Sequence, residues 1–118
     1  MQQAKRYRWE DLPRDTPIPG IDRRRIMGEK MMISELFLHT GAVVPAHQHE
    51  NEQFAYVASG AVRFGVGAKG TPDWREVTIL GGEVLHLPAN LPHSAEALED
   101  SMVIDVFAPP SAKTGVDT

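Results

Sequence analysis

The chain has 118 residues, with 12 Lys and Arg, 16 Asp and Glu, and no cysteine. This length supports a single domain with one hydrophobic core. The absence of cysteine excludes disulfides and thiolate ligands, so a bound metal would be held by histidine and oxygen donors. No apolar run approaches the roughly 18 residues of a membrane span, and the start, MQQAKRYRWEDLPRD, lacks the apolar segment of a secretory signal. We therefore expect a cytoplasmic protein with no membrane partner.

Charge is distributed unevenly along the chain. Residues 1–30 carry eight Lys and Arg against five Asp and Glu, whereas residues 31–118 carry four against eleven. These opposite signs suggest that the N-terminal arm lies across the body of the domain or a partner subunit. The three consecutive arginines, Arg23 to Arg25, lie in a strand-like run without an aromatic platform or a basic helix. We therefore expect solvated, paired arginines and no nucleic-acid partner.

Strand-like runs separated by Gly and Pro turns make up almost the whole chain. Residues 1–20 are interrupted by Pro13, Pro17 and Pro19, which predicts an extended arm. Residues 21–110 contain about eight to ten short strands, the first near residues 21–27 and the last near residues 102–108. Residues 111–118, SAKTGVDT, are predicted to form a flexible tail. With no periodic apolar run long enough for a helix, the pattern predicts an all-β sandwich or jelly roll.

The run from Gln53 to Ser59 alternates in a way that assigns its two faces. Its odd-numbered side chains are the smaller ones, and we assign them to the interior, where they leave room beside a metal. Its even-numbered side chains include Phe54 and Tyr56. This aromatic face packs either against a second copy of the chain or against a second sheet of the same chain. We expect a homodimer.

Two histidine-bearing stretches carry the main functional signal. His47 and His49 are two residues apart, so in an extended strand both imidazoles point to the same face. A third ligand must come from elsewhere, and His93 is presented by a Pro-rich turn after the strand-like run EVLHLP. Three neutral imidazoles with a side-chain oxygen or carboxylate suit a divalent transition metal such as Zn, Ni, Mn or Fe.

Asp105 is the acid that the sequence singles out. It lies in an otherwise apolar run, MVIDVFAPP, on the same face as Val103 and Phe107. A carboxylate in such a strand is costly unless it is paired, directed at a metal or used as an acid or base. Two interpretations remain open: an exposed aspartate at the edge of the sheet, or a general acid/base that reaches into the pocket beside the metal.

The two histidine stretches together resemble the paired motifs of the cupin superfamily. The first motif, Gly-x5-His-x-His followed by a Glu and a Gly, falls on Gly41, His47, His49, Gln53 and Gly60. The second falls on Gly82, Pro88, Asn90 and His93. Three residues depart from these motifs. Gln53 occupies the position of the glutamate in the first motif. In the second motif, Asn90 occupies the position of a glycine and Ala97 that of the final asparagine. The match covers residues 35–108 and implies a single cupin jelly-roll β-barrel.

Within the cupins, the stretches HQHENEQFAYVASG and ALEDSMVIDVFAPP most resemble the pectin-degradation group, which includes enzymes that linearise unsaturated uronates. The resemblance implies a catalytic role for Asp105. It also implies a metal held by His47, His49, Gln53 and His93. Glu52 is the alternative oxygen ligand, because adjacent residues of a strand face opposite ways and cannot both reach the metal.

One position departs from this group. Where the group carries an arginine that engages the substrate carboxylate, this chain has Ser111, and serine cannot replace that charge. A cation for a uronate would have to come from elsewhere, and the candidates are Arg24, Arg25 and Arg63.

Three functions follow from these observations. The first is a metal-dependent isomerase or lyase that acts on a sugar acid or another hydroxy-carbonyl compound, with Asp105 as the acid/base. The second is a metal-dependent cupin dioxygenase, which would need iron in the site. The third is a noncatalytic protein that binds a small ligand.

Overall fold

Two antiparallel sheets form the body of the molecule. The structure is a computed structural model that describes residues 3–116. Within these residues there are ten strands and one short 3-10 helix, η1 (Trp9–Asp11). The strands are β1 (Asp15–Ile18), β2 (Ile21–Met27), β3 (Met32–Leu38), β4 (Val43–His47), β5 (Glu52–Ser59), β6 (Ala61–Val66), β7 (Arg75–Leu80), β8 (Glu83–Leu87), β9 (His93–Ala97) and β10 (Ser101–Ala108).

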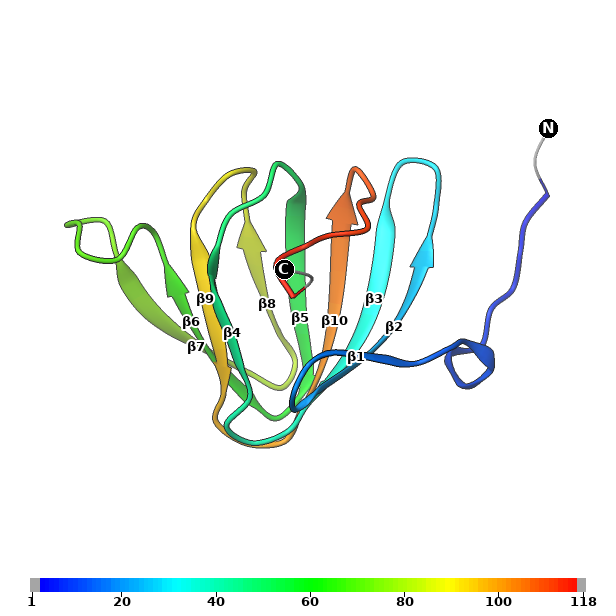
Figure 1. Cartoon of the computed structure of the whole chain (residues 1–118), viewed down its shortest axis with the longest axis horizontal. Coiled ribbons are helices and arrows are strands. Elements are labelled where there is room, and N and C mark those ends of the chain that lie inside the picture. Colours follow the sequence, from blue (N-terminus) through cyan, green and yellow to red (C-terminus); the bar gives the residue numbers. More distant parts are fainter. Residues whose placement is uncertain (1–2, 117–118) are drawn as a thin grey trace.

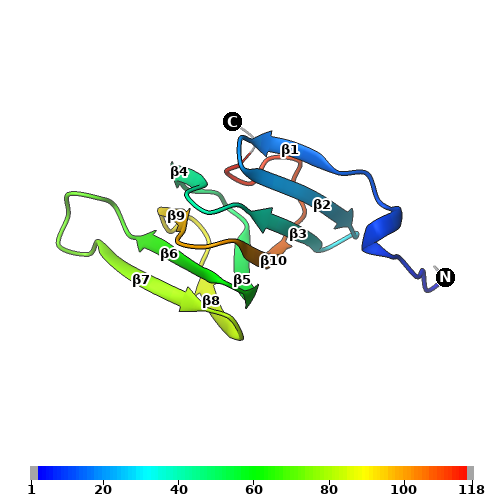
Figure 2. The same ribbon diagram turned by 90° about the horizontal axis from the view of Figure 1, so that it is seen from below.

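The strands are arranged around a common interior. One sheet has the order β1-β2-β3-β10-β5-β8 and the other the order β4-β9-β6-β7, and every pairing is antiparallel (Figure 1). Seen from below, the two sheets lie on either side of this interior (Figure 2). The predicted all-β jelly roll is confirmed, and the strands expected at residues 21–27 and 102–108 correspond to β2 and β10.

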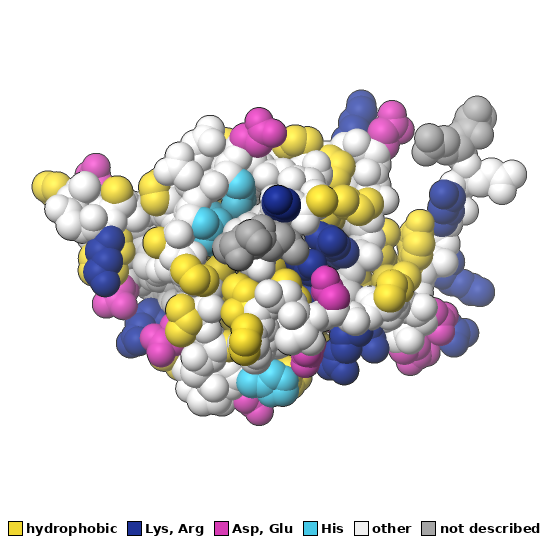
Figure 3. All heavy atoms as spheres, viewed as in Figure 1, with side chains coloured by type: hydrophobic (Ala, Val, Ile, Leu, Met, Phe, Trp, Pro, Cys, Tyr) yellow, Lys and Arg dark blue, Asp and Glu magenta, His cyan; other side chains and the backbone are white. Residues whose placement is uncertain are grey.

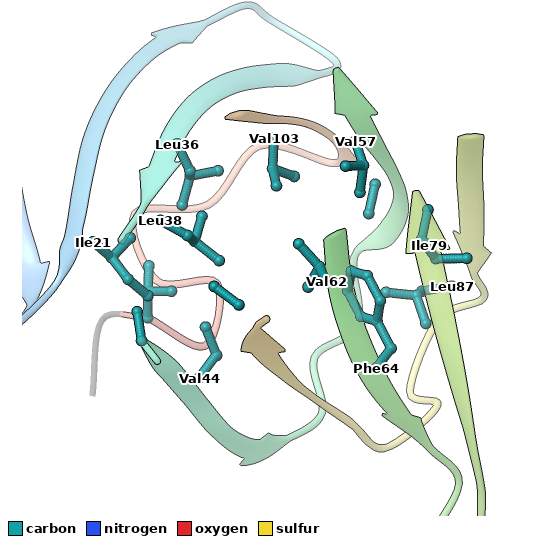
Figure 4. Close-up of a cluster of buried hydrophobic side chains, with 14 of the residues drawn as sticks. Ile21, Leu36, Leu38, Val44, Val57, Val62, Phe64, Ile79, Leu87 and Val103 are labelled. Atoms are coloured by element: carbon teal, nitrogen blue, oxygen red, sulfur yellow. The ribbon is translucent and has the colours of Figure 1, made fainter. Parts of the chain in front are cut away.

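Alternating side chains build the hydrophobic core. Along β3 and β5 every second residue is buried, as expected for strands that expose one face and bury the other. Leu36, Val57 and Val103 of the six-stranded sheet point toward Val62 and Phe64 of the four-stranded sheet (Figure 4). The assignment of the odd-numbered residues of β5 to the interior is confirmed at Gln53, Ala55 and Val57, each of which is at most 6% exposed.

Two motif positions have backbone conformations that explain their residue types. Gly60 joins β5 to β6 with φ +96, and a Cβ there would lie 2.2 Å from Oγ of Ser101. Only glycine fits in that space. Asn90 has φ 64, and asparagine tolerates this left-handed conformation better than most residues. Asn90 can therefore stand where the motif has glycine.

The N-terminal arm joins the sheet before residue 21. Residues 15–18 form β1, which pairs with β2, and the Asp15 carboxylate accepts two hydrogen bonds from the buried Arg23 guanidinium. Residues 3–8 are exposed and extend away from the sheets rather than across them (Figure 1). The expected arm of residues 1–20 therefore includes one sheet strand, and its first two residues lie outside the described ones.

The C-terminal residues are not all loose. Thr114 and Val116 are each 7% exposed, so residues 114–116 belong to the packed body, whereas a loose tail was expected from residue 111. These residues are polar or small, which suggested a tail. They are nevertheless buried, because Thr114 and Val116 line a cavity whose wall is mainly apolar. Residues 117–118 of the expected tail lie outside the described ones.

Within residues 3–116, no helix has the length and apolar character needed to cross a membrane.

Two leucines provide a matched test of this core. Leu87 of β8 is fully buried, whereas Leu80 at the end of β7 is 52% exposed. Leu87→Ala should lower the free energy of unfolding by about 2–5 kcal/mol, because it removes buried methyl groups and leaves a cavity. Leu80→Ala should change it by about 0.5 kcal/mol or less. Urea denaturation of both variants measures the difference, and equal losses would contradict this assignment of the core.

Candidate metal centre

Three histidines meet at one end of the barrel. His47 ends β4, His49 lies in the loop that follows, and His93 begins β9. β4 and β9 are antiparallel neighbours whose register pairs His47 with His93. One ligand atom from each of the three residues lies within 4.8 Å of those from the other two. A single ion with bonds of about 2.0–2.1 Å to each nitrogen could join them after a small adjustment of the rings.

Backbone carbonyls orient all three imidazole rings. Each Nδ1 atom lies 2.8–3.0 Å from a main-chain oxygen two residues away, in Pro45, Asn51 and Leu91 respectively. A carbonyl oxygen only accepts hydrogen bonds, so each Nδ1 donates its proton and each Nε2 keeps a lone pair. The Nε2 atoms of His49 and His93 are buried and have no hydrogen-bond partner among residues 3–116. Buried acceptors of this kind are expected to be satisfied by a bound species.

Burial also favours the neutral form of His47 and His93. It lowers the pKa of His93 to about 4, although the hydrogen bond to the Leu91 carbonyl acts in the opposite direction. Burial likewise lowers the pKa of His47 below its usual value. A metal binds only the unprotonated imidazole, so both rings are in the state required for ligation at neutral pH.

Gln53 supplies a fourth donor atom. This side chain is 6% exposed and lines the same cavity as His47 and His93. Its Nε2 donates a hydrogen bond of 3.0 Å to Oδ1 of Asp105, which fixes the orientation of the amide. Its Oε1 is then left buried and without a hydrogen-bond partner among the described residues. The amide oxygen is therefore available as a ligand.

Glu52, the alternative oxygen ligand, lies elsewhere. Its side chain is 55% exposed, and its carboxylate lies 2.7 Å from Nε2 of His86. The structure thus brings Gln53 rather than Glu52 to the cavity that His47 and His93 line.

Asp105 faces the interior from β10. It lines the cavity together with His47, His93 and Gln53. Burial raises the pKa of its carboxyl group from 3.8 to about 7, while the hydrogen bond donated by Gln53 acts in the opposite direction. A carboxyl group with this pKa can hold or release a proton near neutral pH, which is what a general acid/base requires. Asp105 is not an exposed aspartate of a sheet edge, because β10 lies between β3 and β5.

These donors fit a divalent transition metal. The set consists of three imidazole nitrogens and one amide oxygen, all neutral, and three of the four atoms are buried acceptors without a hydrogen-bond partner in the described chain. Nitrogen-rich sets of this kind suit Zn, Ni, Mn or Fe better than Mg or Ca. The Nδ1 hydrogen bonds supply the supporting contacts usual for metal-bound histidine.

The cavity that His47 and His93 share with Gln53 and Asp105 is small. Its volume is about 50 Å³, and its wall is apolar apart from the histidines, Gln53, Asp105 and Thr114. A larger groove of about 610 Å³, which Arg63, Glu76 and Glu96 line, reaches the two histidines but neither Gln53 nor Asp105. Histidine side chains are visible at the molecular surface near the middle of the face shown in Figure 3.

The arginines proposed as substitutes for the missing substrate arginine lie in different places. Arg24 pairs with Glu35, and Arg63 pairs with Glu76 and Glu96, residues of the face of the four-stranded sheet that points away from the core. Arg25 instead donates a hydrogen bond of 3.0 Å to the carbonyl oxygen of Ala112. Ser111 contacts Lys113 and is not part of the cavity wall.

Sequence reasoning missed two parts of this region. Arg23 is 3% exposed and lines a second small cavity together with Asp105 and Thr114. The alternation Ile21-x-Arg23-x-Arg25 would have placed both arginines on the inward face of β2, had Ile21 been used to fix that face. No local pattern in the C-terminal residues signals that Thr114 and Val116 contribute to the cavity.

A family model described as Cupin domain matches residues 35–107, which is more than half of the chain. The chain belongs to the cupin family. The two motif stretches account for much of this match, and the resemblance proposed from them is confirmed.

Solved structures of other cupins share the fold. KdgF from Halomonas sp. is 27% identical with a TM-score of 0.82, and the match covers 93% of this chain and 97% of KdgF. An RmlC-like cupin from Shewanella frigidimarina is 22% identical with a TM-score of 0.80, over 95% of this chain and 97% of that one. An oxalate decarboxylase of Bacillus subtilis is 20% identical with a TM-score of 0.80, over 96% of this chain and 32% of that one. No curated protein matched this sequence.

The raised pKa of Asp105 predicts a pH-dependent stability difference. Between about pH 4 and pH 7 the folded chain holds a proton on Asp105 that the unfolded chain has released, so the free energy of unfolding falls as pH rises through this window. The asparagine of Asp105→Asn cannot ionise, so the free energy of unfolding of this variant does not fall for this reason as the pH rises. Its stability relative to the unchanged metal-free protein should grow by about 1–3 kcal/mol between pH 5 and pH 8. Denaturation at both pH values with a chelator present measures it, and a constant difference would refute the raised pKa.

Proposed function

We propose that this cupin is a metal-dependent isomerase or lyase that acts on a hydroxy-carbonyl compound such as a sugar acid. The metal would be held by His47, His49, Gln53 and His93, with Asp105 as the acid/base. The observation that carries the proposal is the position of Gln53, whose amide presents Oε1 to the cavity and donates through Nε2 to Asp105. The proposed metal ligand and the proposed proton carrier are thus in direct contact.

The chemistry of the donor set supports a Lewis-acid role. A bound divalent metal would polarise a carbonyl or hydroxyl group of the substrate. Because all four protein ligands are neutral, they would not reduce the charge of the ion as a carboxylate would. The apolar part of the cavity wall, which includes Leu36, Val62 and Phe64, limits the amount of water that can compete with the substrate.

Asp105 would move the proton. With its pKa raised to about 7, its carboxyl group can take a proton from one carbon or oxygen of the substrate and return it to another at neutral pH. The Gln53 amide holds Oδ1, so the other oxygen, Oδ2, is the atom left to face the substrate. One carboxyl group that acts in both directions is sufficient for an isomerase.

A carboxylate-bearing substrate is supported by two further observations. KdgF matches 93% of this chain, and the two motif stretches resemble the pectin-degradation group of cupins. Arg23 and Arg25 lie on the inward face of β2, and Arg23, although paired with Asp15, shares a cavity with Asp105. We propose that these arginines bind the substrate carboxylate, as the arginine of the pectin-degradation group does at the position where this chain has Ser111.

Measurements of metal content and turnover separate the proposed role of His49 as a metal ligand from that of Asp105 as the acid/base. His49→Gln should lower the bound metal per chain well below one, because it removes an imidazole ligand. Asp105→Asn should retain the metal but lose about 10²–10⁴-fold in kcat on sugar acids that include unsaturated uronates, because the variant cannot carry a proton. Elemental analysis of protein purified without chelator gives the metal content. Full turnover by Asp105→Asn would refute the acid/base role.

The same experiments discriminate the alternatives. A dioxygenase would contain iron and would consume oxygen in the presence of its substrate, and a three-histidine site is compatible with that chemistry. A noncatalytic binder would show only a changed ligand affinity in Asp105→Asn. The raised pKa of Asp105 favours the isomerase or lyase, because neither alternative needs a group that titrates near pH 7.

We also propose that the outer face of β5 and β8 binds a second copy of the chain. Phe54, Tyr56 and Val84 are 46%, 39% and 54% exposed, so no second sheet of the same chain covers them. They form a patch on neighbouring strands. Such a patch is a typical candidate for a dimer interface.

Sedimentation tests the dimer. The unchanged protein should sediment as a dimer at micromolar concentration, and Val84→Asp should sediment as a monomer, because it would bury a charge in the interface. The matched control is Val43→Asp, at a valine 48% exposed on the four-stranded sheet, which should remain dimeric. A monomeric unchanged protein would remove this proposal.

A further inference from the structure

The C-terminal segment, residues 111–116, follows β10 and crosses in front of β10 and β5 in the view of Figure 1. Thr114 and Val116 are buried and form part of the cavity wall, opposite the metal-site residues that line the same space. This segment therefore separates the cavity from the solvent on one side.

The backbone of this segment lies directly against a proposed metal ligand. Gly115 has φ +99, and a Cβ at this position would lie 2.1 Å from Nε2 of His47. Nε2 is the ring atom that keeps its lone pair, because Nδ1 donates to the Pro45 carbonyl. The segment thus occupies space beside the nitrogen through which His47 would bind a metal.

The cavity that remains is too small for the proposed substrate. Its volume of about 50 Å³ compares with about 30 Å³ for one water molecule in the liquid. Pockets that bind small organic ligands have volumes of about 300–1,000 Å³. With the C-terminal segment in place, the cavity holds one or two waters and excludes a sugar acid.

Of the elements that line the cavity, the C-terminal segment is the one that can move at least cost. The other lining residues named above lie in strands of the two sheets or, for His47 and His93, at strand ends that are paired with each other. Residues 111–116 belong to no strand. Among the contacts that hold the segment to the barrel is the hydrogen bond from Arg25 to the Ala112 carbonyl. Its displacement would therefore break no sheet pairing.

We propose that residues 111–116 form a movable lid over the metal centre, and that this lid must swing out before a ligand larger than water can enter the cavity beside the buried Nε2 atoms of His49 and His93. This inference rests on the proposed metal site. It adds that the C-terminal segment controls access to the cavity beside the metal site. The segment thereby also limits the size of the ligand that can enter. The lid is a property of the chain itself and is present without metal.

Two truncations of equal length test the lid. One variant ends at Pro110 and lacks residues 111–118, and the control lacks residues 1–8, of which the described ones are exposed and remote from the cavity. In the metal-free proteins, the rate at which diethylpyrocarbonate modifies His49 and His93 should rise at least tenfold in the C-terminal truncation only. Peptide mass spectrometry measures this rate, and circular dichroism checks that each protein is folded. In the cobalt-loaded proteins, extraction of the ion by excess chelator should accelerate in the same variant.

A single substitution tests the lid in the full-length chain. Gly115→Ala places a methyl group against His47 and should displace the segment, so histidine modification should accelerate toward the rate of the truncated protein. The matched control is Gly70→Ala. Gly70 also has a positive φ, +89, but its Cβ would meet nothing within 4 Å. This control separates backbone strain from the collision with His47, and its modification rate should equal that of the unchanged protein.

The outcomes distinguish the lid from the metal site. If neither Gly115→Ala nor the C-terminal truncation changes the modification rate, residues 111–116 do not control access and the proposal is wrong. If the unchanged protein binds cobalt while both variants are folded but bind none, the segment is part of the metal site and is not a lid. If no form binds cobalt but the modification rates still differ as expected, the proposed metal function fails while the lid is supported.

Discussion

The site depends on one kind of contact: a hydrogen bond from the Nδ1 of each histidine to a main-chain carbonyl two residues away. Each bond fixes the tautomer and the ring orientation, so the lone pairs on the three Nε2 atoms are left for another partner. Because the acceptors are backbone atoms, the geometry depends on the local path of the chain at the ends of β4 and β9 and not on further side chains. Burial adds to this effect by keeping His47 and His93 unprotonated at neutral pH.

The two sheets contribute different parts of the site. The four-stranded sheet carries His47 and His93 on paired strands, whereas the six-stranded sheet carries Gln53 and Asp105 on the neighbouring strands β5 and β10. The apolar side chains between the sheets set the distance across which these groups face one another (Figure 4). The core therefore positions the site as well as stabilising the fold, because the cavity wall and the hydrophobic cluster share Leu36, Val62 and Val103.

The sequence predicted those features that follow from alternation and motif spacing. His47, His49 and His93 meet as their positions indicated, and Asp105 shares the inward face with Val103 and Phe107. Contacts made by segments without periodicity could not be predicted. The closing residues have the composition of a loose tail, yet Thr114 and Val116 are buried, because a barrel with an open end exposes apolar surface that even a short polar segment can cover.

The volume of the cavity could not be predicted either, because it depends on how closely the C-terminal segment approaches His47. Because adjacent strand residues face opposite ways, the sequence predicted that only one of Glu52 and Gln53 reaches the metal. The structure shows which one, because Glu52 contacts His86 on the exposed side. Arg23 was considered only as part of a basic run, and its burial depends on Asp15 in a segment expected to be an arm.

The contact between Gln53 and Asp105 also explains why an amide occupies this place in the motif. The two ends of a carboxamide are unlike: one offers hydrogen atoms and the other offers lone pairs. A carboxylate has lone pairs at both ends, so Gln53→Glu would bring two acids to within about 3 Å of each other, and they would have to share a proton. A glutamate in this position would therefore tie its own ionisation to that of Asp105, whereas glutamine leaves the aspartate free to titrate alone.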